Sequence, residues 1–312
     1  MIPIAVAVLF VVAVAAVGCA AGPAIMARPW WFHDPRPVVI QLFIASVGSV
    51  LSVVMAAAAL VAVLPGPAHE KFEGLLDCLP AHWHPADMVG LAAVAALSAW
   101  VGVIAARVTA RVVAVRSARR RYRADLELVA DELPDCPDAV LVGHPAPVVY
   151  CLPAQRRGIV VTRGALSHLG PAELGAALAH ERTHLRQRHH SLILLAEVLA
   201  IMLPALPTLR LARQAVPLLL EMVADDAAAR TAGSETTADA LDRLADAVSP
   251  PETLSAGGRS WARVRAERLR DPTTLARPRR GRPALISGLA TLSAVAVPVG
   301  GPLAVVALIV AC

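Results

Sequence analysis

The chain has 312 residues, a mean hydropathy of +0.61, 57% hydrophobic residues and only 17% charged residues. This composition excludes an ordinary soluble domain of the same length and predicts an integral membrane protein. The net charge of +5 does not indicate direct nucleic-acid binding, because the arginines gather beside apolar segments and do not alternate with aromatic residues. Anionic lipid is the expected partner of these arginines.

Four uncharged apolar segments are long enough to cross about 30 Å of hydrocarbon, and they cover residues 4–21, 38–64, 88–106 and 285–311. The first could be read as a secretion signal, but it lacks a basic N-terminal region, so we expect a retained helix. The last contains Pro298 and Pro302, which leave a kink or re-entrant turn open as an alternative to a single crossing.

Arginines between the third and fourth apolar segments predict the orientation, because cationic side chains resist transfer across a membrane. We expect this part in the cytoplasm, the chain as a multi-pass protein of the cell membrane, and both termini outside. The arginines are Arg107, Arg111, Arg116, Arg119, Arg120, Arg121, Arg123, Arg277, Arg279, Arg280 and Arg282. The five cysteines are odd in number and scattered, which predicts neither a disulfide framework nor a cysteine zinc site.

The cytoplasmic part begins with a basic helix that is expected to run toward Leu133. Three short apolar runs bounded by Gly and Pro then predict a three-stranded sheet, and they cover residues 139–142, 148–152 and 159–162. Pro171 suits a first helical turn and Glu173 the positive end of a helix, so a helix is expected through residues 174–184.

His180-Glu181-Arg182-Thr183-His184 is the most informative stretch of the chain. A helix places residues four apart on one face, where two imidazoles can bind one zinc ion, and Glu181 is the natural general base. Hydrolytic zinc sites have three protein ligands and one open position, so Glu221 is the expected third ligand. Asp225, one turn later, is expected to hold the outer N–H of a ligating histidine, with Asp226 as the alternative.

Residues 192–209 are apolar enough to be taken for a fifth span. A single crossing would place Glu221 on the opposite side of the membrane from His184, so one zinc ion could not join them. We therefore expect a helix that is broken near Pro204 and Pro207 and that packs on the domain or lies in the membrane interface. Two amphipathic helices are expected after it, at residues 238–248 and 261–270.

Each assignment has a simpler alternative. The two histidines and Glu181 would then form a solvated polar helix face, Glu221 would be a surface carboxylate, and Asp225 would form a salt bridge to Arg230. His168, His189 and His190 are expected to be polar residues of the interface and not ligands. His69, His82 and His84 lie beside Cys78 in an external loop, where a structural or incidental role is expected.

The run from Gly158 to Gly164, together with the histidine motif and Glu221-Met-Val-Ala-Asp225, resembles the membrane-embedded gluzincin peptidases. Among them it most resembles the BlaR-type antirepressor proteases of β-lactam sensing, which are related to the heat-shock and CAAX-type membrane zinc proteases. The resemblance implies that His180, His184 and Glu221 bind Zn²⁺, that Glu181 is catalytic and that Asp225 supports a ligand. It also implies that Ile159, Val160, Val161 and Thr162 form an edge strand that pairs with an extended substrate.

The expected fold is an α-helical integral membrane protein with about four transmembrane helices and an inserted α+β gluzincin-like domain. Three spans fall in residues 1–106, the peptidase domain in residues 107–283 and the last membrane segment in residues 284–312. Sensor members of the family carry a penicillin-binding domain after the last span, whereas this chain stops at Cys312. Direct β-lactam sensing is therefore not expected, and a signal would come through residues 65–87, the membrane or another protein.

Three functions are open from the sequence. The first is a zinc endopeptidase that cleaves a cytoplasmic helix-turn-helix repressor, and the second is a quality-control protease for membrane proteins. The third belongs to another class, a membrane receptor or scaffold with an inert zinc site. Glu181 argues against the third, because a structural zinc site needs no base beside its ligands. The sequence leaves the oligomeric state open, a homodimer included.

Overall fold

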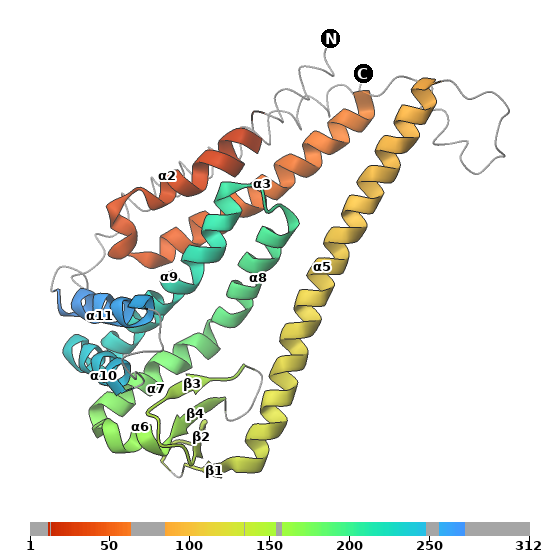
Figure 1. The fold of residues 1–312 in the computed structure, drawn as a ribbon. Helices are drawn as coiled ribbons and strands as arrows, with labels where there is room; N and C mark the ends of the chain where they lie inside the picture. Colours follow the sequence, from red (N-terminus) through yellow and green to blue (C-terminus); the bar gives the residue numbers. More distant parts are fainter. Residues whose placement is uncertain are drawn as a thin grey trace.

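The computed structural model describes residues 12, 14–63, 85–133, 135–153, 158–247 and 256–271. This part of the chain is mostly helical, with one small four-stranded sheet. Figure 1 shows long helices at one end and the sheet with the shorter helices at the other. The fourth expected span and the group His69, His82 and His84 lie outside the described residues.

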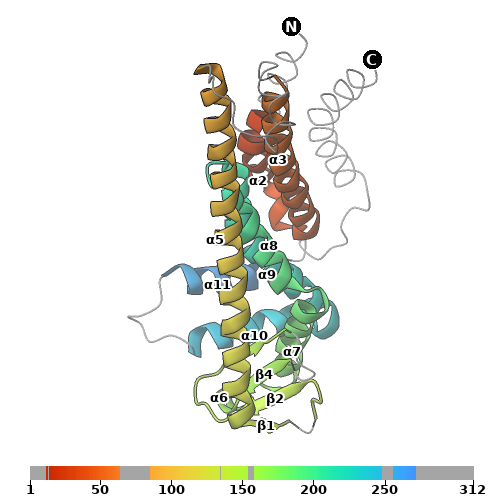
Figure 2. The same cartoon turned by 90° about the vertical axis from the view of Figure 1, so that its right-hand side faces the viewer.

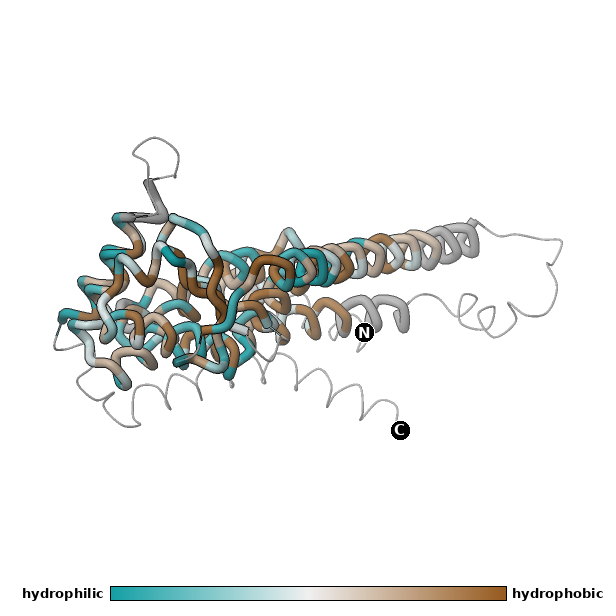
Figure 3. Tube along the Cα trace, turned by 90° about the horizontal axis from the view of Figure 1, so that it is seen from below, coloured by the Kyte–Doolittle hydropathy of each residue, from teal (hydrophilic) through white to brown (hydrophobic). Residues whose placement is uncertain are grey.

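Two of the described helices are long and apolar enough to cross a membrane, α3 (Pro35–Val63) and α5 (Pro85–Val129). Figure 3 shows apolar colouring along both helices beyond the end of the molecule that holds the sheet. Exposed apolar side chains follow one face of α3 at spacings of 7, 4 and 3 residues, as a lipid-facing surface would. They are Ile40, Val47, Leu51 and Val54. These two helices weakly suggest membrane association, and the expectation of four spans is not confirmed.

The described part of the first expected span is short. It consists of a π-helix, η1 (Val14–Ala21), and is continued by α2 (Gly22–Met26) and a 3₁₀ turn, η2 (Pro29–Phe32). The backbone N–H of Gly22 donates to Oγ1 of Thr208 at 3.0 Å, and this hydroxyl donates to the carbonyl of Val17 at 2.9 Å. A Cβ at Gly22 would lie 2.8 Å from Cα of Thr208, so only glycine fits this crossing.

Helix α5 is continuous for 45 residues, so the expected domain boundary at residue 107 falls inside it. Arg111 of α5 forms an ion pair with Glu197 at 2.8 Å. At the lower end of α5, Leu126 packs on the sheet. The chain then enters a strand, β1 (Ala130–Glu132), where the sequence had predicted that the helix continues toward Leu133.

The sheet contains the three expected strands, β2 (Ala139–Val142), β3 (Val149–Cys151) and β4 (Ile159–Thr162), and β1 as a fourth. Its order is β1-β2-β4-β3, with β2 and β4 parallel and the other two pairs antiparallel. Successive side chains of a strand point to opposite faces. Val160 therefore packs toward α5, whereas its neighbours Ile159 and Val161 pack on the helix that carries the histidines.

That helix is α7 (Pro171–Arg186), which follows the short α6 (Arg163–His168) and confirms the expected histidine-bearing helix. Its start is capped, because the side chain of Glu173 accepts a hydrogen bond from the N–H of Gly170 at 2.8 Å. Gly164 in α6 lies against the carbonyl of Pro145, where any Cβ would overlap the oxygen.

Helices α8 (His189–Met202) and α9 (Pro207–Ala232) form an antiparallel hairpin. The break between them confirms the expected interruption near Pro204 and Pro207, and it returns Glu221 to the side of His184. The hairpin packs on α3 through an apolar cluster, and Figure 2 shows it extending from the end that holds the sheet toward that helix. Members of the cluster include Leu42, Ala45, Ala215, Val216 and Leu219.

Two further helices, α10 (Ser234–Ala247) and α11 (Ala256–Arg270), complete the described chain and agree with the amphipathic helices expected there. They pack against α9 through Ala229, Ala238, Ala266 and Leu269. Arg270 of α11 forms ion pairs with three carboxylates of α10, which hold the two helices together: Glu235, Asp239 and Asp242.

Candidate metal centre

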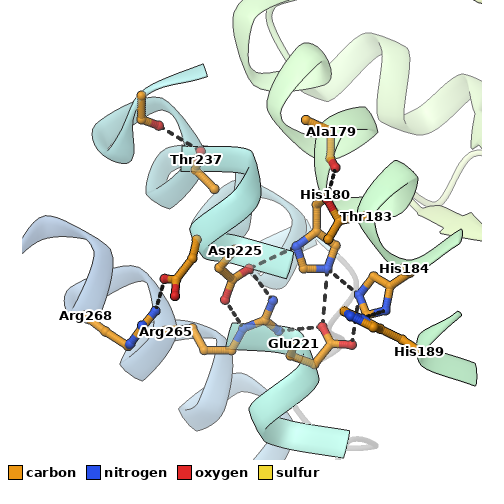
Figure 4. A network of polar contacts seen from close by, with 12 residues as sticks. Ala179, His180, Thr183, His184, His189, Glu221, Asp225, Thr237, Arg265 and Arg268 are labelled. Atoms are coloured by element: carbon orange, nitrogen blue, oxygen red, sulfur yellow. Dashed lines mark hydrogen bonds and ion pairs between the residues drawn. The ribbon is translucent and has the colours of Figure 1, made fainter. Parts of the chain in front are cut away.

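Helices α7 and α9 bring together the three side chains predicted as metal ligands. Nε2 of His180 lies 3.4 Å from Oε2 of Glu221, and Nε2 of His184 lies 3.4 Å from Oε1 of the same carboxylate. The two Nε2 atoms are 3.0 Å apart. Figure 4 shows the two imidazoles of α7 and the carboxylate of α9 pointing toward one another. Within the described residues they form the one group of at least three His, Cys, Asp or Glu side chains that could hold a metal ion.

The donor set fits zinc in both chemistry and spacing. Zinc binds imidazole nitrogen and carboxylate oxygen at about 2.0–2.2 Å in a tetrahedral arrangement, which places neighbouring donor atoms about 3.3–3.5 Å apart. The two imidazole nitrogens lie 3.0 Å apart and each lies 3.4 Å from a different oxygen of Glu221, so one donor atom from each residue falls within 4.8 Å of the others. Two histidines and one carboxylate also leave the fourth position open, as hydrolytic zinc sites require.

Asp225 lies where the sequence placed it, at the outer nitrogen of a histidine. Its Oδ1 is 3.0 Å from Nδ1 of His180, and its side chain is fully buried. Arg265 of α11 donates to both oxygens of Asp225, at 2.6 and 2.7 Å, and lies 3.1 Å from Glu221. The alternative partner for Asp225, Arg230, is replaced by Arg265. A bidentate pair of this kind fixes the carboxylate in one orientation.

Asp226 does not take the alternative role of holding a histidine. Its carboxylate accepts from Arg268 at 2.7 Å, and that buried arginine also donates to the carbonyls of Phe32 and His33. Arg268 therefore links Asp226 of α9 to the end of η2 and the residue that follows it. Asp225 and Asp226 have different partners, because neighbouring residues point to different sides of α9.

The charges of the centre shift the pKa values of its two histidines in opposite directions. Burial opposes the charged form of His180, but its hydrogen bonds to Asp225 and Glu221 and their charges outweigh burial and raise its pKa to about 10. Burial lowers the pKa of His184 to about 3, against the charge of Glu221. Burial also acts against the charged form of Glu221, but His180 and Arg265 lower its pKa to about 2. Without metal, His180 is therefore cationic at neutral pH and His184 is neutral.

Glu181 lines the same pocket as His180 and Glu221. Burial raises its pKa above the usual value of 4.5, although the charge of His180 acts in the opposite direction. A raised pKa brings a carboxylate closer to the range in which a general base works at neutral pH. Cys151 at the end of β3 is buried, and burial together with the charge of Glu181 raises the pKa of its thiol. The thiol thus remains a neutral neighbour of Glu181.

The pocket around the centre is lined by side chains of β3, α7, α9, α10 and α11. Most of its remaining lining residues are apolar: Val149, Ala176, Ala177, Ala240, Leu241 and Leu244. Arg265 and Thr237 add polar atoms. The pocket therefore offers an apolar surface directly beside the candidate metal ligands.

The expectation that Ile159, Val160, Val161 and Thr162 form a substrate-pairing edge strand is wrong. This strand, β4, pairs with β2 on one side and with β3 on the other, and its residues are buried. The edge of the described sheet on the site side is β3. Hydrogen bonds from Thr162 to Val148 and from Leu152 to Gly158 join the two strands, so alternation turns the backbone groups of Val149 and Cys151 to the free side.

Sequence reasoning missed two further members of the site. Arg265 received no role, although it lies in a basic run, because nothing local shows which of its arginines reaches back to α9. His189 was expected to be an interfacial residue, but it is fully buried and its Nδ1 lies 3.0 Å from Nδ1 of His184. The adjacent His190 is half-buried and makes no such bond to His184, and His168 lies outside the candidate ligand group.

Residues 116–249 match the sequence model of Peptidase family M48. The matched segment contains all three candidate ligands, Glu181 and Asp225, and it spans less than half of the chain. It does not single out the BlaR type or the CAAX type. No curated protein and no solved structure gives a significant match. The family match and the candidate metal-binding group together support assignment of this chain to a zinc metallopeptidase family.

Proposed function

We propose that the chain is a membrane-bound zinc metalloendopeptidase whose peptidase part faces the cytoplasm. The observation that carries the proposal is the convergence of His180, His184 and Glu221 in one pocket with Glu181. Zinc held by the first three residues would polarise the peptide carbonyl and lower the pKa of the attacking water. An inert structural site needs no partly buried carboxylate with a raised pKa beside an open metal position.

Other residues of the chain transfer the proton and position the ligands. Glu181 accepts the proton of the attacking water and passes it to the leaving amine. Asp225 fixes the ring of His180, and Arg265 compensates the negative charges of Asp225 and Glu221. These contacts hold the centre in one geometry before a substrate arrives, so little reorganisation is needed during the reaction.

We infer that the substrate binds as an extended strand along β3. The free backbone groups of Val149 and Cys151 can pair with it, as in other cases of strand addition. The apolar side chains of α7 and α10 in the pocket favour an apolar residue next to the cleaved bond. The expected substrate class is therefore a protein with an accessible extended segment that contains apolar residues.

A cytoplasmic transcriptional repressor of the helix-turn-helix type is the substrate that we propose first. The resemblance to the antirepressor proteases supports it. The arginines that flank the peptidase part also support it, because they predict that this part faces the cytoplasm, where a repressor is found. Membrane-protein quality control is the second candidate. It is favoured by the packing of the α8–α9 hairpin on α3, because this places the site next to a helix long enough to span a membrane.

Comparison of cells that carry wild-type protein with cells that carry Glu181→Gln tests these proposals. This variant keeps the size and hydrogen-bonding capacity of the side chain but removes the base, so cleavage is expected to fall by about 10²–10⁴-fold. Quantitative proteomics identifies the intact protein that accumulates in the variant. A repressor supports the first candidate, and unfolded membrane proteins support the second. Unchanged proteomes, together with no peptide cleavage by either purified protein, refute the peptidase and favour a receptor or scaffold. Equal peptide cleavage by both proteins refutes the role of Glu181 as the base.

A further inference from the structure

The two histidines of the candidate centre have different partners at their outer nitrogens. Nδ1 of His180 faces the carboxylate of Asp225, which Arg265 holds in place. Nδ1 of His184 faces another imidazole, that of His189, at 3.0 Å. Nε2 of His189 in turn lies 3.3 Å from Oε1 of Gln187. One ligand is thus supported by a charged pair and the other by a neutral chain of side chains.

The positions of the protons in this chain follow from its two ends. Nε2 of His184 faces Glu221 and His180, so it carries the lone pair directed at the metal position. The proton of a neutral His184 is then on Nδ1 and is donated to Nδ1 of His189. His189 must carry its own proton on Nε2, where the amide oxygen of Gln187 accepts it. Each ring nitrogen of His184 and His189 is thus either a donor or an acceptor, and no two donors face each other.

The turn between α7 and α8 brings His189 to this place at a conformational cost. Arg188, directly before it, has a φ of 52° and a left-handed backbone conformation, the only non-glycine residue of this kind in the described part of the chain. Such a conformation is unfavourable for a residue with a Cβ. The turn allows the ring of His189 to meet that of His184 edge-on, with centroids 4.7 Å apart and planes at 86°.

We propose that His189 is a positioning residue for the metal ligand His184, with Gln187 fixing its tautomer. The proposal rests on the zinc site of the proposed function. Without an acceptor at His189, the buried Nδ1–H of His184 loses its partner, and the ring is free to rotate away from the metal position. Loss of an outer partner of this kind lowers metal affinity by about 10–100-fold.

Two substitutions that differ in the position of one polar atom test the proposal. In His189→Asn the amide oxygen takes the place of Nδ1, whereas in His189→Gln the terminal amide reaches the place of Nε2. The zinc dissociation constant of the full chain in lipid nanodiscs is measured by competition with a chromophoric chelator. We expect His189→Asn to bind zinc nearly as well as the wild type and His189→Gln to bind about 10–100-fold more weakly. Equal melting temperatures of the zinc-free proteins show that folding is not the cause.

Equal affinities of wild type and His189→Gln, or equal weakening in both variants, overturn the proposal. Gln187→Leu is a second test if His189→Gln does not fold, because Gln187 is exposed and its loss disturbs no core. We expect weaker zinc binding in Gln187→Leu, and unchanged affinity contradicts the chain of hydrogen bonds. If the zinc affinities of wild type, His189→Asn and His189→Gln follow the expected order but the wild type cleaves no peptide, the proposed peptidase is refuted and the role of His189 is not. Cleavage with equal zinc affinities refutes only the role of His189.

Discussion

Zinc binding is expected to release close to one proton from His180 at slightly alkaline pH. Its pKa of about 10 keeps the metal-free imidazole charged, with Nε2 blocked by the proton that zinc must replace. At pH 8, two units below this pKa, about 99% of His180 carries the proton. His184 and Glu221 have pKa values of about 3 and 2, so neither contributes a proton.

The same competition makes zinc affinity depend on pH with a definite sign. Because the pKa of His180 is raised, the proton competes with zinc at every pH below about 10. The apparent association constant should rise about tenfold per pH unit between pH 7 and 9 and level off near pH 10. At pH 7 it should be about a thousandfold below its plateau.

Isothermal titration calorimetry at pH 8 in buffers with different ionisation enthalpies measures the released protons directly. Asp225→Asn is the matched control, because it keeps an acceptor for Nδ1 of His180 but removes the negative charge that raises its pKa. Fewer protons should be released from this variant. A water that ionises at the metal adds a proton in both proteins, so the difference between them isolates His180. An affinity that does not change from pH 7 to 9, or equal proton release in both proteins, would refute the reasoning.

Three further predictions concern stability and the metal. Arg265→Met removes the bidentate partner of the buried Asp225, which then keeps only its contact with His180, and should lower the free energy of unfolding by about 1.5–3 kcal/mol at pH 7. Burial acts against the charged form of Asp225, but Arg265 outweighs it and lowers the pKa below 3.8. This contribution is therefore present above that value and is lost on further acidification, so denaturation curves should converge below it. Gly164→Ala should cost about 1–3 kcal/mol by contact with the Pro145 carbonyl, whereas Gly175→Ala, with no atom within 4 Å, should not lower the melting temperature. A strong chelator should abolish peptide cleavage and added zinc should restore it, and a chelator-resistant activity would contradict a metallopeptidase.

The expected strands and the histidine-bearing helix could be read from the sequence because their signals are local. Pro171 and Glu173 mark the start of α7, and Gly and Pro bound the strands. The extra strand β1 escaped prediction, because Ala130–Glu132 carries no apolar alternation and becomes a strand only by pairing with β2. The edge position of β3 depends on strand order, which no single strand records.

The sequence by itself determined which residues could form a metal-binding group, because helical periodicity places His180 and His184 on one face and Glu221 one turn before Asp225. It also determined that the chain must turn back between His184 and Glu221, since one metal ion cannot be shared across a bilayer. Only the tertiary structure decided which side chains besides Asp225 contact the candidate ligands. Arg265 reaches Asp225 across 40 positions of sequence, and His189 depends on the left-handed turn at Arg188. These contacts depend on how the helices pack and on the conformation of one turn, and neither can be predicted from the local sequence.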